Sequence, residues 1–183
     1  MYFKSLDRVE REAGRLLERA RVVEAPVNVE DLALRLGLEV RYERNFRSDL
    51  SGVLVKQAAK STIGINASHP KTRQRFSIAH EIGHFWLGHA GDMFVDEAKG
   101  RASIVFRDGR SSEGTEVPEM EANRFAAAVL MPASLLIVSL KRVVNAGTAL
   151  SEKEVVAQLA REYQVSPQAM RIRLTSLGLM VVE

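Results

Sequence analysis

The chain has 183 residues, 46% hydrophobic and 27% charged, which fits one globular domain with a substantial core. It has no cysteine, which excludes disulfides, thiolate zinc sites and cysteine nucleophiles, and its net charge of +3 gives no argument by itself for nucleic-acid binding. The charged start does not resemble a signal peptide and no apolar run approaches the roughly 20 residues of a membrane span, so we expect a cytoplasmic protein without membrane contact.

Two helices are expected at the start of the chain. Residues 5–24 have a charged face and an apolar face, the pattern of an amphipathic helix, and Pro26 ends it. The next helix has Asn28 as its N-cap, acidic residues in its first turn and Gly37 as its stop signal.

A small sheet and a long helix are expected next. SGVLVKQ (51–57) and STIGINAS (61–68) are strand-like and separated by a short linker, which predicts an antiparallel hairpin. Pro70 then opens a helix that runs to about Gly88. Beyond it the pattern is harder to interpret, although residues 102–109 could form a strand.

The rest of the chain is expected to be helical, over residues 118–132, 133–145, 152–163 and 167–177. Helices, a small sheet and more helices follow one another in the sequence. We therefore predict an α+β fold, mostly helical, in which a small antiparallel sheet lies next to the long helix and the tail resembles a helix-turn-helix.

Three of the four histidines fall within AHEIGHFWLGHA (79–90). On a helix, His80 and His84 lie one turn apart and point the same way, as two imidazoles on one tetrahedral zinc must. Glu81 lies about 100° round the helix from His80, where it can accept a proton from metal-bound water. This is the HExxH arrangement. Histidines that flank a glutamate by chance are the alternative, but such a match arises in roughly one chain of this length in a hundred.

His89 does not fit as a third ligand. On a continued helix it would lie about 180° from His80. The spacing His84-xxx-Gly88-His89 is also out of step with the HxxGxxH of three-histidine zinc sites. If Gly88 ends the helix, His89 could face the substrate. His69, before the helix, is expected outside the site.

The helix over residues 118–132 offers a carboxylate ligand, either Glu119 or Glu121. Glu119 lies at the border of the apolar stripe and Asn123 one turn below it, whereas Glu121 and Arg124 point outward. We therefore expect Glu119 to bind the metal and Glu121 to be solvated. Asn123 is expected to contact one of the metal ligands without binding the metal itself. Without the histidines, both glutamates would be taken as residues that favour a helix N-terminus. The stripe comprises Ala122, Phe125, Ala126, Val129 and Leu130.

Three segments together resemble the ImmA/IrrE family of bacterial metallo-endopeptidases. They are RQRFSIAHEIGHFWLGH, EMEANRFAAAVLMP and LAREYQVSPQAMRIRLTSLGL, in this order. HExxH alone is shared by many zinc enzymes, and the second segment is far more specific. The resemblance extends from PVNVEDLALRLGLEV to the end of the chain and is weakest over residues 90–116.

The resemblance implies a thermolysin-like (gluzincin) core. It implies one Zn²⁺ per chain on His80, His84 and Glu119, with Glu81 as the general base. It further implies a substrate, a helix-turn-helix transcriptional repressor that is cut to switch on mobile-element or stress-response genes. Residues 1–147 would form the zinc metallopeptidase domain, with residues 148–183 as a helical region packed on it.

Two parts of the mechanism stay open at this point. The strand over residues 61–68 could pair with an extended substrate segment. The oxyanion could be stabilised by His89, Arg73 or Arg75, and the sequence does not choose among them.

The tail also allows a rival function. In a DNA reader, Arg171 and Arg173 on the last helix would meet phosphates or guanine edges. The weak positive charge makes direct DNA binding the less favoured interpretation. The two helices could instead pack on the core or bind the repressor. A non-proteolytic antirepressor or DNA-binding regulator, acting by binding alone, is the alternative class. It would have no chemical need for Glu81, so the complete motif favours the enzyme.

Overall fold

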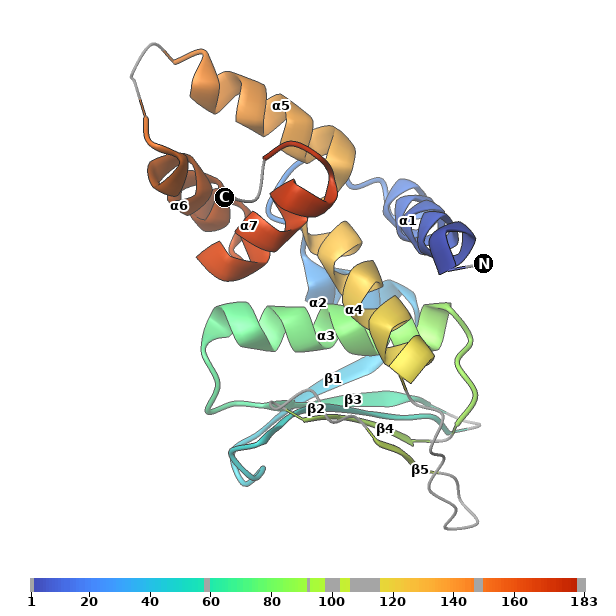
Figure 1. Ribbon diagram of the computed structural model, residues 1–183. Helices are drawn as coiled ribbons and strands as arrows, with labels where there is room; N and C mark the ends of the chain where they lie inside the picture. Colours follow the sequence, from blue (N-terminus) through green and yellow to red (C-terminus); the bar gives the residue numbers. More distant parts are fainter. Residues whose placement is uncertain are drawn as a thin grey trace.

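The computed structural model describes residues 2–57, 60–91, 93–97, 103–105, 116–146 and 150–180. All the helices lie on one side of a small sheet (Figure 1). One of them, α3 (Lys71–Trp86), runs directly over that sheet, and the others lie beside or above it. The α+β fold expected from the sequence is therefore confirmed in outline.

The sheet has the strand order β1-β3-β2-β4-β5 in the described part of the chain. The predicted hairpin is present, because β2 and β3 pair in antiparallel register with Gly52 opposite Ile65. β1, however, pairs with β3 in parallel, so the sheet is mixed and the prediction of a purely antiparallel sheet is wrong. β3 thus runs parallel to β1 on one side and antiparallel to β2 on the other. The strands are β1 (Glu39–Glu43), β2 (Leu50–Val55), β3 (Thr62–Asn66), β4 (Met93–Glu97) and β5 (Ser103–Val105).

The position of β3 decides one open question. Both of its edges are already paired, with β1 on one side and β2 on the other. An extended substrate therefore cannot add to this strand, and this possibility is excluded. The expected strand over residues 102–109 is present as the shorter β5, and the rest of that range lies outside the described residues.

The first two helices are α1 (Tyr2–Arg19) and α2 (Val29–Arg35). α1 ends before the predicted boundary at residue 24, whereas α2 begins as expected, with the Asn28 side chain accepting a hydrogen bond from the Asp31 backbone. Gly37, at φ +75°, follows the end of α2 in the left-handed region that glycine tolerates best. The buried face of α1 includes Val9, Ala13, Leu16 and Leu17.

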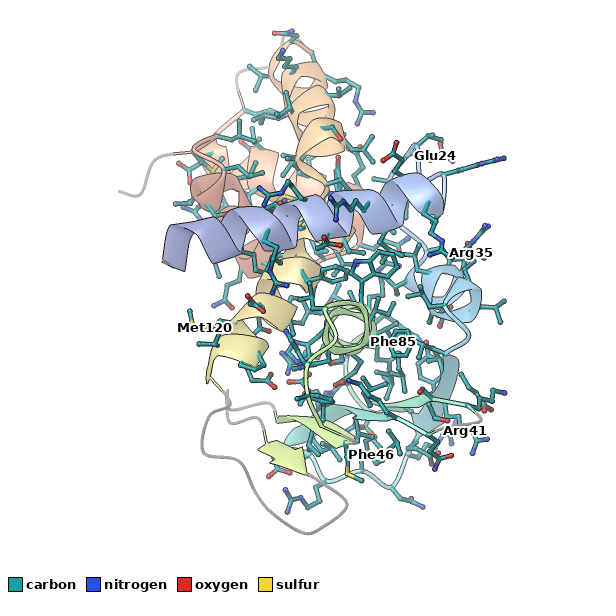
Figure 2. The ribbon with its side chains drawn as sticks, turned by 90° about the vertical axis from the view of Figure 1, so that its right-hand side faces the viewer. Glu24, Arg35, Arg41, Phe46, Phe85 and Met120 are labelled. Atoms are coloured by element: carbon teal, nitrogen blue, oxygen red, sulfur yellow. The ribbon has the colours of Figure 1, made fainter. Side chains whose placement is uncertain are left out.

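α3 is enclosed by its neighbours and does not have the one-sided apolar face of a surface helix. Figure 2 looks along α3 and shows it between the sheet, α1 and α4 (Glu116–Leu130). Every residue from Ser77 to His84 is buried. α3 and α4 cross very closely at Gly83, where an added Cβ atom would lie 3.2 Å from the Cα of Ala122. This crossing brings the start of α4 close to the histidines of α3.

The last helices are α5 (Ala133–Val144), α6 (Glu152–Tyr163) and α7 (Pro167–Ser176), close to the predicted ranges. A buried arginine, Arg173, holds α7 in place: Nη2 donates to Glu10 Oε2 of α1 (3.0 Å) and Nε donates to the Met131 carbonyl (3.1 Å). Its side chain is 3% exposed. Arg173 therefore cannot reach DNA, which removes one of the two arginine contacts of the less favoured DNA-binding alternative. Arg171 forms a surface ion pair with Glu152.

In the part of the chain that the structure describes, no single helix has the length and apolarity needed to cross a membrane. α4 and α5 would meet that test only as a pair, and they are bent by 49° to each other.

We predict that Arg173→Met destabilises the protein by about 2–3 kcal/mol, because it leaves the Glu10 carboxylate and the Met131 carbonyl without their buried donor. Urea unfolding at neutral pH measures this change. Arg171→Met is the matched control, and we expect it to change the unfolding free energy by less than about 0.5 kcal/mol. Similar losses in both variants would contradict the structural role of Arg173.

Candidate metal centre

The structure brings together the three side chains that the sequence singled out as ligands. Nε2 of His80 lies 3.1 Å from Oε2 of Glu119, and Nε2 of His84 lies 3.2 Å from the other carboxylate oxygen. The two Nε2 atoms are 3.0 Å apart. All the candidate ligand atoms lie within 4.8 Å of one another. α3 supplies both histidines from consecutive turns, and α4 supplies the carboxylate across the close crossing at Gly83.

This donor set fits a metal ion. Two ring nitrogens and one carboxylate converge on one point, and the buried Oε1 of Glu119 has no well-formed hydrogen bond, despite its short distance to His84. A buried polar atom without a partner is costly, so the convergence of these donor atoms suits a bound cation. Two histidines and one carboxylate are also the protein ligands of a common type of catalytic zinc site, which leaves one position open.

Glu81 lies beside this cluster and is fully buried. Neither of its carboxylate oxygens has a hydrogen-bond partner. Burial raises the pKa of Glu81 well above its usual range, although His80 opposes the shift. Space for the carboxyl group depends on Gly52 of β2, because a Cβ atom there would lie 3.1 Å from Glu81 Oε1. An uncompensated carboxyl group kept in such a place is typical of an active site.

Asn123 lies where the helix phase of α4 predicts it, with its Oδ1 3.1 Å from Nδ1 of His80. This places the amide behind the ring nitrogen that faces away from Glu119. On the other histidine, Phe94 of β4 stacks on the His84 ring with centroids 4.3 Å apart. The rings of His80 and His84 are therefore each contacted by a further side chain that is not itself a candidate ligand.

The electrostatics of the cluster follow from burial and mutual contact. Burial lowers the pKa of His84 to about 4, which keeps its ring neutral, as a metal ligand must be. Burial would raise the pKa of Glu119, but its close contacts with His80 and His84 outweigh this and lower it to about 2. Burial likewise lowers the pKa of His80, but Glu119 and the nearby carboxyl groups raise it to about 9. The contact between Glu119 and His80 thus favours the charged form of each side chain.

Two arginines considered for oxyanion stabilisation are occupied elsewhere. Arg73 donates to Ser51 Oγ (2.8 Å) and pairs with Asp96 at 3.2 Å. Arg75 donates to the backbone carbonyls of Val27 and Gln164, away from the cluster. The sequence did not point to Asp96, because its strand has too weak a pattern to be placed from the sequence.

Of the two alternatives left open for His89, the structure excludes the one on a continued helix. α3 ends at Trp86, and Gly88 at φ +69° turns the chain back toward the site. His89 Nδ1 consequently lies 2.9 Å from His84 Nδ1. His89 therefore lies behind His84, on the side opposite Glu119.

The solvated position predicted for Glu121 is also wrong. Its side chain is 10% exposed and receives a hydrogen bond from Arg8 of α1 at 2.9 Å. Its Oε2 also lies 3.2 Å from His89 Nε2. The helix phase of α4 does point Glu121 away from the apolar stripe, but α1 packs there and covers it. His69, as expected, lies elsewhere, with Nε2 3.1 Å from the Ser48 carbonyl.

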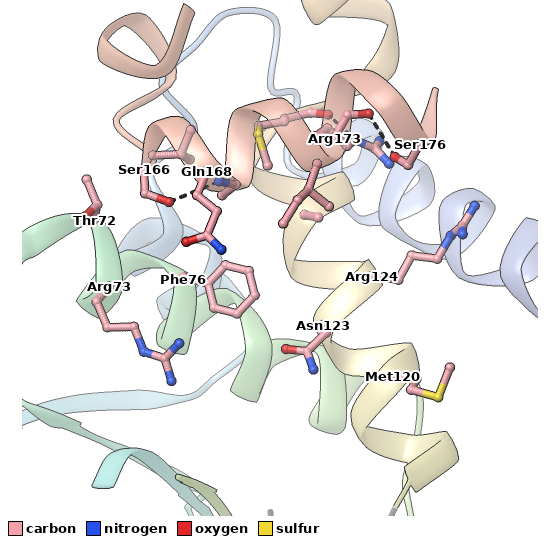
Figure 3. Close-up of a pocket in the computed structure, with 15 residues that line it drawn as sticks. Thr72, Arg73, Phe76, Met120, Asn123, Arg124, Ser166, Gln168, Arg173 and Ser176 are labelled. Carbon is pink, nitrogen blue, oxygen red and sulfur yellow. Dashed lines mark hydrogen bonds between the residues drawn. The ribbon is translucent and has the colours of Figure 1, made fainter. Parts of the chain in front are cut away.

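A cavity of about 660 Å³ opens next to the cluster, between α3, α4 and α7 (Figure 3). Asn123, which contacts His80, is part of its wall. Much of the remaining lining is apolar, with Phe76 from α3, Met120 from α4 and Ile172 from α7. Ile172 is 61% exposed although its side chain is large and apolar.

Comparison with known proteins agrees with this geometry. The model of a peptidase family described as IrrE N-terminal-like domain matches residues 33–175. The chain belongs to this family, the ImmA/IrrE family. The matched segment contains the His80, His84 and Glu119 cluster together with Glu81.

The relatives of this ImmA/IrrE chain include a curated protein of Deinococcus radiodurans, the radiation response metalloprotease IrrE. It is 34% identical over 116 residues, which are 63% of this chain and 31% of the relative. A solved structure, a Mycobacterium tuberculosis transcriptional regulator, superposes with a TM-score of 0.58 at 14% identity. That match covers 92% of this chain and 47% of the other, and it shows a shared fold. The chain thus spans about a third to a half of the length of these proteins.

We predict that Glu119→Gln weakens zinc binding at least about tenfold more than Glu121→Gln does, because only Glu119 reaches both histidine Nε2 atoms. Competition with a chromophoric chelator measures both affinities. The two glutamates lie on the same helix and each variant removes one acidic charge, so the difference between them isolates the direct contact of Glu119 with the two Nε2 atoms. Equal losses, or a greater loss in Glu121→Gln, would contradict the ligand assignment.

Proposed function

We propose that this ImmA/IrrE chain is a zinc-dependent endopeptidase of the cytoplasm. The observation that carries the proposal is the buried carboxyl group of Glu81, which has no hydrogen-bond partner and lies beside a cluster able to hold a metal. A binding protein would gain nothing from this costly group. A peptidase requires one, because a proton must move from the attacking water to the leaving amine.

The chemistry follows from the positions of these side chains. His80, His84 and Glu119 would hold one Zn²⁺, which when bound supplies the Lewis acidity that activates water and polarises the scissile carbonyl. Glu81 accepts the proton of the attacking water and returns it to the leaving nitrogen. Burial raises the pKa of Glu81, which makes its carboxylate a stronger base toward the proton of the attacking water. Asn123 accepts a hydrogen bond from Nδ1 of His80 and leaves Nε2 for the metal.

The cavity between α3, α4 and α7 is the proposed place for the substrate. Asn123, which contacts His80, lines this cavity, so the cavity adjoins the metal cluster. Much of its lining is apolar, so it suits a large apolar side chain of the cleaved segment. The tail would then contribute to substrate recognition through Ile172. We propose residues 1–147 as the metallopeptidase domain and residues 148–183 as a helical region packed on it. The family match runs to residue 175, across this boundary, in support of one functional unit.

The proposed substrate is a helix-turn-helix transcriptional repressor whose cleavage switches on mobile-element or stress-response genes. Membership of the ImmA/IrrE family supports this substrate, and the Deinococcus relative is named for a radiation response. The rival function is a regulator that acts by binding alone. It could be an antirepressor or a DNA-binding protein, and the antirepressor is the better supported of the two. Its DNA-binding form is weakened by the burial of Arg173.

We predict that Glu81→Gln retains the fold and about one zinc per chain but loses repressor cleavage by at least about a hundredfold, because an amide cannot accept the proton. His80→Ala should lose the metal as well, because it removes a ligand. The measurements are elemental analysis of the purified protein and gel analysis of the helix-turn-helix repressor encoded nearest to this gene.

Two outcomes would contradict the proposal. If purified wild-type protein contains no transition metal and takes up none, the enzyme is excluded. If Glu81→Gln still relieves repression in a reporter assay while the repressor stays intact, the protein acts by binding.

We predict that Ile172→Arg reduces repressor cleavage by roughly tenfold, mainly through a higher KM, because a charged side chain replaces apolar surface in the cavity wall. Val138→Arg is the matched control, since Val138 is 66% exposed on α5 and does not line the cavity. Initial rates over a range of repressor concentrations separate KM from kcat. Unchanged kinetics in Ile172→Arg would place the substrate elsewhere.

A further inference from the structure

We infer that His89 and Glu121 are positioning residues that fix the tautomer and orientation of His84. The inference rests on the proposed metal centre and concerns the part of the molecule behind it. Arg8, Glu121, His89 and His84 form a continuous line of polar contacts that starts on α1 and ends at the metal cluster.

The distances along this line are all those of hydrogen bonds. Arg8 Nη2 lies 2.9 Å from Glu121 Oε2, and the same oxygen lies 3.2 Å from His89 Nε2. The next contact joins Nδ1 of His89 to Nδ1 of His84 at 2.9 Å. The far nitrogen of His84, Nε2, faces Glu119 and His80. The line therefore reaches the one ring nitrogen of His84 that does not point into the cluster.

The protons on this line can be assigned from one end to the other. A histidine that binds metal through Nε2 carries its proton on Nδ1, so His84 donates from Nδ1. The contacting Nδ1 of His89 must then be the acceptor, which leaves the proton of His89 on Nε2. From there it is donated to Glu121, which can only accept as a carboxylate. Arg8 donates to the same carboxylate, so every contact has one donor and one acceptor.

His89 is also held firmly enough to direct its neighbour. Its side chain is only 7% exposed, and its ring lies against those of His84 and Phe94. Its backbone carbonyl accepts a hydrogen bond from Lys56 Nζ at 2.6 Å. The turn at Gly88 thus returns the chain to a fixed position from which His89 can orient His84.

The two proposed histidine ligands therefore have different support. Asn123, a neutral amide, accepts from His80, whereas His84 is supported by an imidazole that itself contacts a carboxylate. A carboxylate behind an imidazole makes the ring a better electron donor to a metal. Loss of His89 should consequently weaken metal binding without removing any ligand.

The test measures zinc affinity by chelator competition in the full chain. We expect His89→Phe to weaken zinc binding roughly 10- to 100-fold, because it leaves the Nδ1 proton of His84 without an acceptor. His89→Gln should recover most of the loss, because its amide can accept from His84 and donate to Glu121. His69→Gln is the control and should bind zinc as the wild type does. The inference is overturned if His89→Phe binds zinc as tightly as wild type, or if His89→Gln is no better than His89→Phe.

A second readout needs no variant. Long-range nitrogen–proton NMR of the zinc-loaded wild type should show His84 protonated on Nδ1 and His89 protonated on Nε2. A His89 ring protonated on Nδ1 would overturn the inference, while the metal centre and the proposed peptidase could still stand. A wild type that binds no zinc would remove the proposed function and this inference together, so the two failures are distinguishable.

Discussion

The contact between α3 and α4 at Gly83 is the constraint on which the site depends. Because glycine has no side chain, the helix backbones meet with the Cα of Ala122 only 3.2 Å from where a Cβ atom of residue 83 would lie. Glu119 lies one turn before Ala122 on α4 and therefore reaches both histidines of α3. A larger residue at position 83 would separate the helices and move the carboxylate out of reach. The ligand cluster is thus a product of close packing as much as of the motif that contains the histidines.

Polar groups occupy the most buried part of the molecule. Two histidines and the Glu81 carboxyl group lie in the interior with almost no exposure, where each would normally destabilise the fold. The surroundings offset part of this cost, because Asn123, Phe94 and His89 each contact one of the histidine rings. Of these three side chains, Glu81 is the one for which the described part of the chain supplies no hydrogen-bond partner. The buried carboxyl group of Glu81 therefore lowers the stability of the fold at the position where proton transfer is proposed.

Local signals in the sequence predicted much of the structure, and distant contacts account for what they missed. The boundaries of α6 and α7 could be predicted because Ser151 and Ser166 are N-caps whose effect is confined to one turn. The parallel pairing of β1 with β3 has no such signal, since it depends on where β2 lies. Glu121 has the phase of a solvated residue, and it is buried because Arg8, 113 residues away in the chain, lies over it. The position of His89 could not be decided from the sequence, because it depends on whether the chain turns at Gly88 and interrupts the periodicity.

The ion pair between Arg173 and Glu10 joins positions 163 residues apart, which is most of the chain. The wall that α7 gives to the cavity is therefore fixed only when residues from both ends of the described chain are present. During synthesis the histidines of α3 emerge long before α7 does, and an incomplete chain would have the metal cluster but an unfinished cavity. The order of the sequence thus delays completion of the cavity wall until α7 has been made.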